Sequence, residues 1–201
     1  ELALLEPLRD KLRPEVFGPV PIPPSTLPPR SLRENLREAQ ALLREAGWTY
    51  RDGALRNEKG EPFVIEFLND QPSLVRIVAP FEQALTKLGI GWIYRQVDFS
   101  LSKERMDKFE FELTTRRIPG MVAPGGELLE YFGSRAATTP GSANYWGIAD
   151  PAVDDLLQKV VQAKTRADLN AAMRSLDRVL SHGHYSIPQY YSGAFFIGYR
   201  A

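Results

Sequence analysis

Two consecutive arginines, Arg116 and Arg117, stand where a predicted strand runs into a long loop rich in proline and glycine. A guanidinium group presents a rigid fork of N–H donors that matches a carboxylate, so an arginine here could hold the carboxylate of a ligand. Consecutive side chains of a strand point to opposite faces, and at most one of the pair should therefore face a given cleft. The alternative is that both arginines are solvated or pair with nearby acids such as Glu127.

Asn144, Tyr145 and Trp146 form a second group of candidate ligand-binding residues. An asparagine amide both donates and accepts hydrogen bonds, which suits the main chain of a peptide. Tyrosine and tryptophan offer large, stiff apolar surfaces that can hold varied side chains. Trp146 could equally be a core residue beneath the helix that follows it. Tyr190 joins the candidates because Tyr190 and Tyr191 are adjacent in a predicted strand, so that one faces the core and the other faces outward.

Signatures of catalysis are missing from the residue pattern. The two histidines, His182 and His184, have no nearby acid or sulfur to complete a metal site, and the chain has no cysteine. Neither a nucleophile elbow nor a glycine-rich nucleotide fingerprint is present. We therefore predict no catalytic residue, no metal ligand and no cofactor. A hydrolase lobe of the peptidase or esterase type stays an alternative, because the members of a catalytic triad need not be neighbours in sequence.

The composition narrows the choice of partners. The 201 residues carry 25 basic and 25 acidic side chains, so charge gives no reason to expect nucleic acid or an anionic membrane as partner. A hydrophobic content of 43% is ample for a core, and no run of about 18 apolar residues exists that would span a bilayer. The absence of cysteine fits an oxidising compartment.

The order of predicted elements indicates an α/β fold in one domain. Residues 1–30 are expected to be an extended lead-in, because seven prolines between Pro14 and Pro29 leave little room for a helix. Residues 31–201 are expected to form one α/β ligand-binding lobe with a mixed sheet flanked by helices. Predicted helices cover 31–46, 73–88 and 100–108 and then start at Pro151 and after Thr165; predicted strands cover 48–50, 54–56, 63–68, 90–97, 109–115, 185–191 and 195–199. Ser31, Asp150 and Thr165 are the predicted caps of the helices that follow them, and Asp52-Gly53 is the predicted turn between the first two strands. In the helix at 31–46, the residues expected to face inward are Leu32, Leu36, Ala39, Leu42, Leu43 and Ala46.

Several segments together resemble the family 5 extracellular solute-binding proteins of ABC importers, the oligopeptide, dipeptide and nickel class. They are ELALLEPLRDKLRPEVFG at 1–18, LREAQALLREAGW at 36–48, FEFELTTRRIPGMVAPGGELLEYFGS at 109–134, GSANYWGIADPAVDDLL at 141–157 and RSLDRVLSHGHYSIPQYYSG at 174–193. The combination is most similar to the YejA-type branch, which is associated with oligopeptides and the peptide-nucleotide microcin C.

This resemblance implies a periplasmic-binding-protein-like type II lobe, the C-terminal one of a longer two-lobed protein. It implies capture of an oligopeptide or peptide-like ligand in a cleft between the lobes, with the N-terminal lobe and an ABC permease of the inner membrane as partners, and a periplasmic or extracellular, membrane-associated location. In dipeptide-type relatives, an aspartate in the loop after the strand matching 109–115 holds the ligand's amino terminus. Here that loop reads RRIPGMVAPGG, without aspartate. A protein-docking domain without a small ligand is the other alternative.

Overall fold

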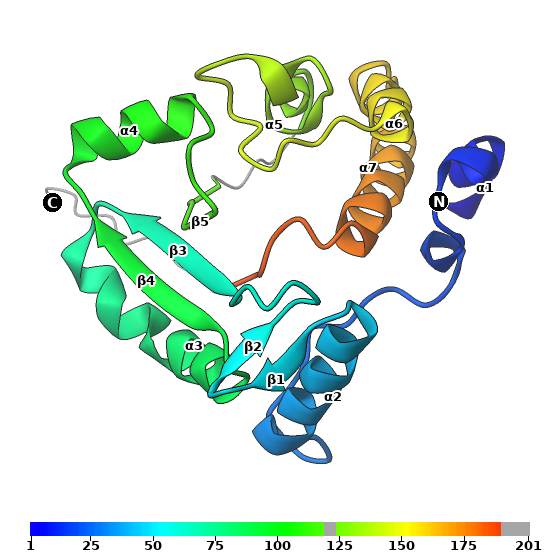
Figure 1. Cartoon of the computed structure of the whole chain (residues 1–201). Coiled ribbons are helices and arrows are strands. Elements are labelled where there is room, and N and C mark those ends of the chain that lie inside the picture. Colours follow the sequence, from blue (N-terminus) through cyan, green and yellow to red (C-terminus); the bar gives the residue numbers. More distant parts are fainter. Residues whose placement is uncertain (119–123, 190–201) are drawn as a thin grey trace, which may run out of the picture. The chain divides into compact units, whose positions relative to one another are not determined.

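The computed structural model, which describes residues 1–118 and 124–189, contains a parallel sheet in the order β4-β3-β5 (Figure 1). Its strands are β3 (Val64–Asn69), β4 (Gly91–Gln96) and β5 (Leu113–Thr114). The contacts of the chain divide it into two units. As far as the chain is described, unit 1 comprises residues 1–21, 124–138 and 146–189, and unit 2 comprises residues 22–118 and 139–145.

Helices cover both faces of the sheet in unit 2. They are α3 (Val75–Lys87), which follows the short 3-10 helix η3 (Pro72–Leu74), and α4 (Phe99–Asp107). On the face covered by α3, Trp92 of β4 lies 5.3 Å from the ring of Phe67 and 5.9 Å from the ring of Phe81 in α3. On the other face, Arg105 of α4 contacts Glu66 of β3. The strand–helix–strand alternation predicted from the sequence is confirmed, and the fold class is α/β.

The hairpin and the helix that precede the sheet are also as predicted. Strands β1 (Thr49–Arg51) and β2 (Ala54–Arg56) pair antiparallel around Asp52 and Gly53, both of which have positive φ. The backbone twist of a two-residue turn with positive φ matches the right-handed twist of the strands that it joins. Helix α2 (Leu32–Glu45) begins at Ser31, whose hydroxyl accepts a hydrogen bond from the amide of Glu34.

Helix α2 buries a narrower stripe than its sequence suggested. Leu36, Ala39 and Leu43 pack against the hydrophobic cluster of unit 2, made of Leu55, Leu85, Leu88 and Ile90. Leu32 and Leu42 were expected to face inward, yet both are exposed. The contact of α2 with the cluster is therefore limited to Leu36, Ala39 and Leu43 among the residues expected to face inward.

The strand predicted at 109–115 is shortened to Leu113–Thr114. Phe109 takes a left-handed conformation with φ 58°, and the amides of Phe109 and Glu110 bond to Met106 and Arg105 at the end of α4. The carboxylate of Glu112 accepts a hydrogen bond of 2.6 Å from the backbone amide of Glu66. The residues before Leu113 therefore complete the helix end and contact the neighbouring strand through a side chain, not through a backbone ladder.

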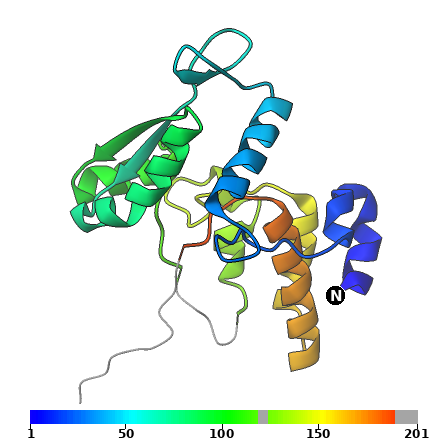
Figure 2. The same cartoon turned by 90° about the horizontal axis from the view of Figure 1, so that it is seen from below.

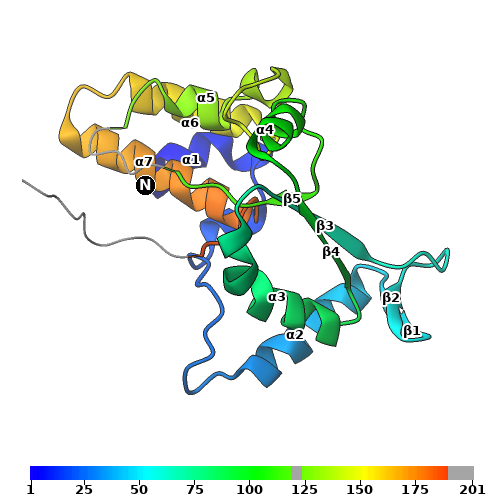
Figure 3. The ribbon, with the colours of Figure 1, turned by 90° about the vertical axis from the view of Figure 1, so that its left-hand side faces the viewer.

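Unit 1 is built around two helices, α6 (Pro151–Val161) and α7 (Arg166–His182). They lie side by side, with the N-terminal helices against them (Figures 2 and 3). Asp150 caps α6 and Thr165 caps α7, as predicted. The remaining elements of the unit are α1 (Leu2–Leu5), the 3-10 helices η1 (Glu6–Lys11), η2 (Pro14–Phe17) and η4 (Ala136–Thr138), and α5 (Leu128–Phe132).

A partly buried arginine joins the N-terminal segment to α7. Arg178 donates to the carbonyl oxygens of Val16 and Gly18 at 3.0 and 2.8 Å and pairs with the carboxylate of Glu1. Residues 18–30 contain no helix or strand, in keeping with their prolines, whereas residues 2–17 are mostly helical. The predicted domain boundary at residue 30 stays a prediction.

A strand was predicted at 185–191, but residues 185–189 have no regular secondary structure. The strand predicted at 195–199 lies outside the described residues. Within the described ranges, none of the helices combines the length and the apolar character needed to cross a membrane.

Candidate functional site at the carboxyl edge of the parallel sheet

The topology of unit 2 marks one edge of the sheet as the place for a ligand. From β3 the chain crosses through α3 to β4 on one side, and from β4 it crosses through α4 to β5 on the other side of β3. The direction of winding therefore reverses at β3, between β3 and β5. Ligands of open α/β sheets bind beyond the carboxyl ends of the strands at such a switch point. Here the residues beyond those ends are Asp70 and Gln71 after β3, and Thr115 and Arg116 after β5.

Arg116 is held in place by Tyr145. One terminal N–H of its guanidinium donates to the tyrosine hydroxyl at 3.1 Å, and the guanidinium carbon lies 4.8 Å from the centre of the tyrosine ring. The centre of the Phe111 ring lies 6.5 Å from the centre of the Tyr145 ring. A guanidinium over an aromatic face is attracted by the ring quadrupole, which limits the positions that the side chain can take.

The guanidinium keeps capacity for a further partner. Among the described residues, neither Nε nor Nη1 of Arg116 has a hydrogen-bond acceptor, and the side chain is exposed. An oriented guanidinium with free N–H groups can bind a carboxylate through two parallel hydrogen bonds. The arrangement is therefore chemically suited to holding an anion, and it does not resemble a proton-transfer site.

The backbone on both sides of the switch point is fixed by side-chain hydrogen bonds. The amide of Asn69, at the end of β3, donates to the hydroxyl of Tyr94 and to the carbonyl oxygen of Gln71, each at 2.6 Å. The hydroxyl of Thr114 donates to the carbonyl oxygen of Leu68 at 3.0 Å. The hydroxyl oxygen of Thr115 is buried and has no hydrogen-bond partner within the described part of the chain. Side-chain hydrogen bonds thus hold this edge, and the hydroxyl of Thr115 is an unsatisfied polar group of it among the described residues.

A charged network behind this edge joins α4 to β3. The carboxylate of Glu66 accepts from Nε of Arg95 at 3.0 Å and from Nη2 of Arg105 at 2.9 Å. Arg105 also donates to the carbonyl oxygen of Glu110 at 3.0 Å. The hydrogen bond from Arg95 and the interactions with Arg105 hold the pKa of the Glu66 carboxyl below its usual value of 4.5. Through Arg105, the network fixes the segment that leads into β5 and so towards Arg116.

The structure brings together two of the six predicted ligand-binding residues, Arg116 and Tyr145. Arg117 is exposed, and Asn144 has no exposed surface, while its backbone amide donates to the hydroxyl of Ser142 at 3.3 Å. Trp146 belongs to unit 1, where its ring lies 5.4 Å from that of Phe132.

Tyr190 lies outside the described residues. The ligand-binding roles of all six residues stay predictions. Phe111, Thr115 and Asp70 lie at or near this edge and were not among the predicted residues. For Asp70 and Thr115 the available signal was their position directly after strands that belong to one parallel sheet.

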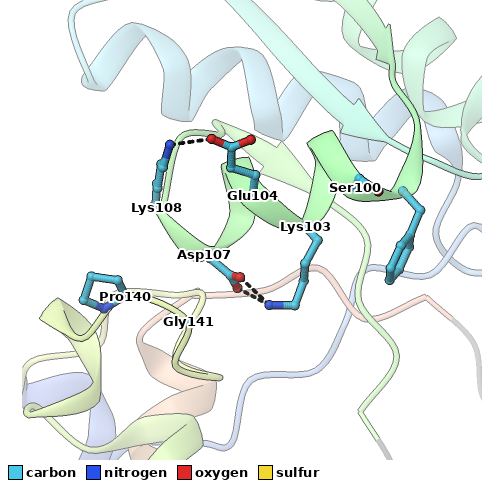
Figure 4. A pocket seen from close by; sticks show the side chains of 8 residues that line it. Ser100, Lys103, Glu104, Asp107, Lys108, Pro140 and Gly141 are labelled. Atoms are coloured by element: carbon cyan, nitrogen blue, oxygen red, sulfur yellow. Dashed lines mark hydrogen bonds and ion pairs between the residues drawn. The ribbon is translucent and has the colours of Figure 1, made fainter.

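A shallow surface hollow of about 650 Å³ lies elsewhere in unit 2, along α4 (Figure 4). Its charged side chains are already paired, Lys103 with Asp107 and Lys108 with Glu104. The amide of Gly141 donates to the carbonyl oxygen of Asp107 at 2.9 Å. Because its charges neutralise one another, this hollow presents no unsatisfied group around which a ligand would be oriented.

The histidines do not form part of this edge. His182 is the last residue of α7 in unit 1, and His184 follows with φ 54°. In the described ranges, no group of three or more acidic, histidine or cysteine side chains is placed to hold a metal ion.

Comparison with known proteins gives the family. Residues 12–140 match the bacterial extracellular solute-binding proteins, family 5 Middle. The chain belongs to this family. The family 5 chain is 40% identical, over 200 residues, to a protein of Agrobacterium fabrum described as "Probable peptide-binding protein YejA". The match covers 99% of this chain and 33% of that relative. The chain thus spans about a third of the length of the curated relatives that it matches.

Solved structures show the fold of this family 5 chain. It resembles a mannohexaose-bound periplasmic oligopeptide-binding protein of Thermotoga maritima with a TM-score of 0.69 and 21% identity, over 80% of this chain and 31% of that one. It also resembles the oligopeptide-binding protein AppA of Bacillus subtilis, solved with a nonapeptide, with a TM-score of 0.66 and 19% identity, over 91% of this chain and 37% of that one. The predicted fold, that of a lobe of a periplasmic binding protein, is confirmed.

Proposed function

We propose that this chain is the C-terminal, ligand-binding lobe of the substrate-binding component of an ABC importer, and that it captures oligopeptides or peptide-like solutes. Membership of family 5 supports the class of protein. The observation that carries the site is the guanidinium of Arg116, oriented by Tyr145 beyond the carboxyl end of β5. The name of the Agrobacterium fabrum relative supports a peptide as ligand.

The proposed roles follow from the chemistry of each side chain. Arg116 binds a carboxylate of the ligand, and Tyr145 both orients the guanidinium and offers a ring to an apolar ligand group. The other residues proposed to line the cleft are Arg117, Asn144, Trp146 and Tyr190. In this proposal the protein catalyses no reaction and needs no cofactor or metal.

The proposed mechanism is capture followed by delivery. The ligand lies between this lobe and an N-terminal lobe of the same protein and contacts both. Since these contacts exist together only when the lobes are closed, ligand shifts the hinge equilibrium towards the closed form. The closed protein then docks on the permease in the inner membrane, which places the protein in the periplasm or on the outer side of the cell membrane.

Mass spectrometry of the small molecules released by denaturing the full-length protein tests this function. We expect peptides of mixed sequence to co-purify, and Arg116→Gln to lower their amount strongly because the oriented cation is lost. Arg37→Gln, which removes an exposed positive charge on α2, is the matched control and should leave the amount unchanged. A single non-peptide species would refute the proposed ligand class. Unchanged peptide loading in Arg116→Gln would refute the proposed site.

A further inference from the structure

A second hollow of unit 2 lies at the amino ends of β3 and β4, the edge of the sheet opposite to the carboxyl ends (Figure 1). This amino-end hollow has a volume of about 430 Å³, a size typical of sites for small organic molecules. Two residues of α3, Glu82 and Thr86, border it, and its apolar lining residues are Pro62, Phe63, Val64, Ile90 and Trp92. All of these residues belong to unit 2, so the hollow is formed within one unit.

Stacked rings position the two aromatic residues of the hollow. The centre of the Phe63 ring lies 4.5 Å from that of Trp48, and the centre of the Trp92 ring lies 5.3 Å from that of Phe67. Offset stacking of this kind is favourable beyond the area that it buries. Phe63 and Trp92 are therefore held by neighbours in the fold and do not need an occupant to take their places.

Backbone hydrogen bonds around the hollow are already made. The amide of Leu55 donates to the carbonyl oxygen of Gly89 at 2.7 Å, and the amide of Phe63 donates to that of Leu55 at 2.8 Å. The amide of Gly91 donates to the carbonyl oxygen of Phe63, also at 2.8 Å. These backbone groups are thus used within the fold, and an occupant would be recognised by side chains.

Two polar side chains of the hollow lack a partner. Glu82 is the charged residue among the described ones that line it, and this half-buried carboxylate has no donor and no basic partner within the described ranges. The indole nitrogen of Trp92 is buried and has no acceptor among the same residues. A carboxylate and an N–H group that lose solvent without gaining a partner are both unfavourable. An occupant that carries a cation and an acceptor would satisfy them.

We infer that the amino-end hollow is a binding site for an organic cation, a guanidinium or ammonium group on an apolar stem. The carboxylate of Glu82 pairs with the charge, and Phe63 and Trp92 contact the stem, since aromatic rings attract cations and bury apolar groups. An acceptor beside the stem takes the hydrogen bond of the Trp92 indole. The hollow lies at the other edge of the sheet from Arg116, so this inference goes beyond the proposed function and does not depend on it.

The experiment follows the indole N–H signal of Trp92 by NMR in the full-length protein carrying isotopically labelled tryptophan. The signal is assigned by its absence from Trp92→Phe. Three probes are titrated: butylguanidinium, N-acetylarginine methylamide, and N-acetylcitrulline methylamide, which is nearly the same shape as the arginine probe but neutral. Glu82→Gln keeps the size of the side chain and removes its charge. Glu58→Gln removes an exposed acid elsewhere in unit 2 and is the matched control.

We expect the arginine probe to shift the Trp92 signal saturably and the citrulline probe to bind about tenfold more weakly or worse, since it lacks the charge that Glu82 pairs. Glu82→Gln should remove this difference, and Glu58→Gln should retain it. Tighter binding of the arginine probe than of butylguanidinium would identify a basic residue of a polypeptide as the occupant, and equal binding would identify a free organic cation. If neither cation shifts the signal, or if the citrulline probe binds as well as the arginine probe, the inference is overturned. The comparison of probes on the unaltered protein does not depend on whether Glu82→Gln folds.

Discussion

Replacing Glu66 with glutamine should destabilise unit 2 without abolishing its fold. The substitution keeps the shape of the side chain but removes the charge that Arg95 and Arg105 share. Arg105 would keep its hydrogen bond to the carbonyl oxygen of Glu110 but lose its ion pair with β3. The change thus separates the contribution of one carboxylate from that of the surrounding packing.

The two arginines should contribute unequally. The side chain of Arg95 is 52% exposed, so its pair with Glu66 is screened by water and is worth about 0.2–1 kcal/mol. The side chains of Arg105 and Glu66 are 26% and 21% exposed, and a hydrogen bond to a charged group contributes about 1.5–3 kcal/mol before that partial exposure is discounted. We expect Glu66→Gln to lower the free energy of unfolding by about 2 kcal/mol, equivalent to roughly 4–8 °C in melting temperature for a chain of this size.

The pH dependence has a definite sign. The pKa of Glu66 is lowered in the folded state below its usual value of 4.5. The carboxylate therefore stabilises the fold fully above the unfolded pKa, and this contribution is lost as the pH falls below 4.5 and through the folded pKa. Urea denaturation followed by tryptophan fluorescence should be measured at neutral pH and at a pH below the folded-state pKa of Glu66. The difference in free energy of unfolding between the unaltered protein and Glu66→Gln should be smaller at the acidic pH.

Double-mutant cycles decide whether the reasoning from exposure holds. The coupling energy between Glu66→Gln and Arg105→Gln should exceed that between Glu66→Gln and Arg95→Gln, because the Arg105 pair is better shielded. Equal couplings, or a larger one for Arg95, would show that burial does not set the strength of this network. A Glu66→Gln protein as stable as the unaltered one at neutral pH would refute the whole estimate.

Two further substitutions test local features of the fold. Gly89→Ala should cost more than Gly60→Ala in urea denaturation, because both glycines have φ near 80° but only at Gly89 would a Cβ lie 2.6 Å from the ring of Tyr50; equal costs would mean that the backbone conformation alone matters. Thr165→Ala should lower the free energy of unfolding by about 1 kcal/mol by removing the hydroxyl that accepts from the amide of Asp168 at 3.1 Å. Thr165→Ser keeps that hydroxyl and should be nearly neutral, and a loss as large as that of the alanine variant would contradict the capping role.

Local signals sufficed for much of the fold. Ser31, Asp150 and Thr165 each cap the helix that follows, as their residue types and spacing predicted. Asp52 and Gly53 form the predicted hairpin turn because both adopt the positive φ that such a turn requires. These features depend on a few neighbouring residues, so a single sequence contains the information that determines them.

The strand before Arg116 shows where local signals fail. Phe109, Phe111 and Leu113 alternate with polar residues as in a half-buried strand, which predicts pairing over the whole segment. The structure uses Phe109 to end α4 and Phe111 to support the ring of Tyr145. Both uses depend on residues distant in sequence or on the way in which a helix ends, and an alternating pattern contains neither kind of information.

The candidate residues of the site were predicted from residue types, whereas their arrangement could be described only from the structure. The chemistry of arginine and of aromatic rings was enough to select Arg116 and Tyr145, but not to show that one orients the other. The order of the strands, β4-β3-β5, places Arg116 at the switch point of the sheet, and the spacing of residues along the chain does not contain that order.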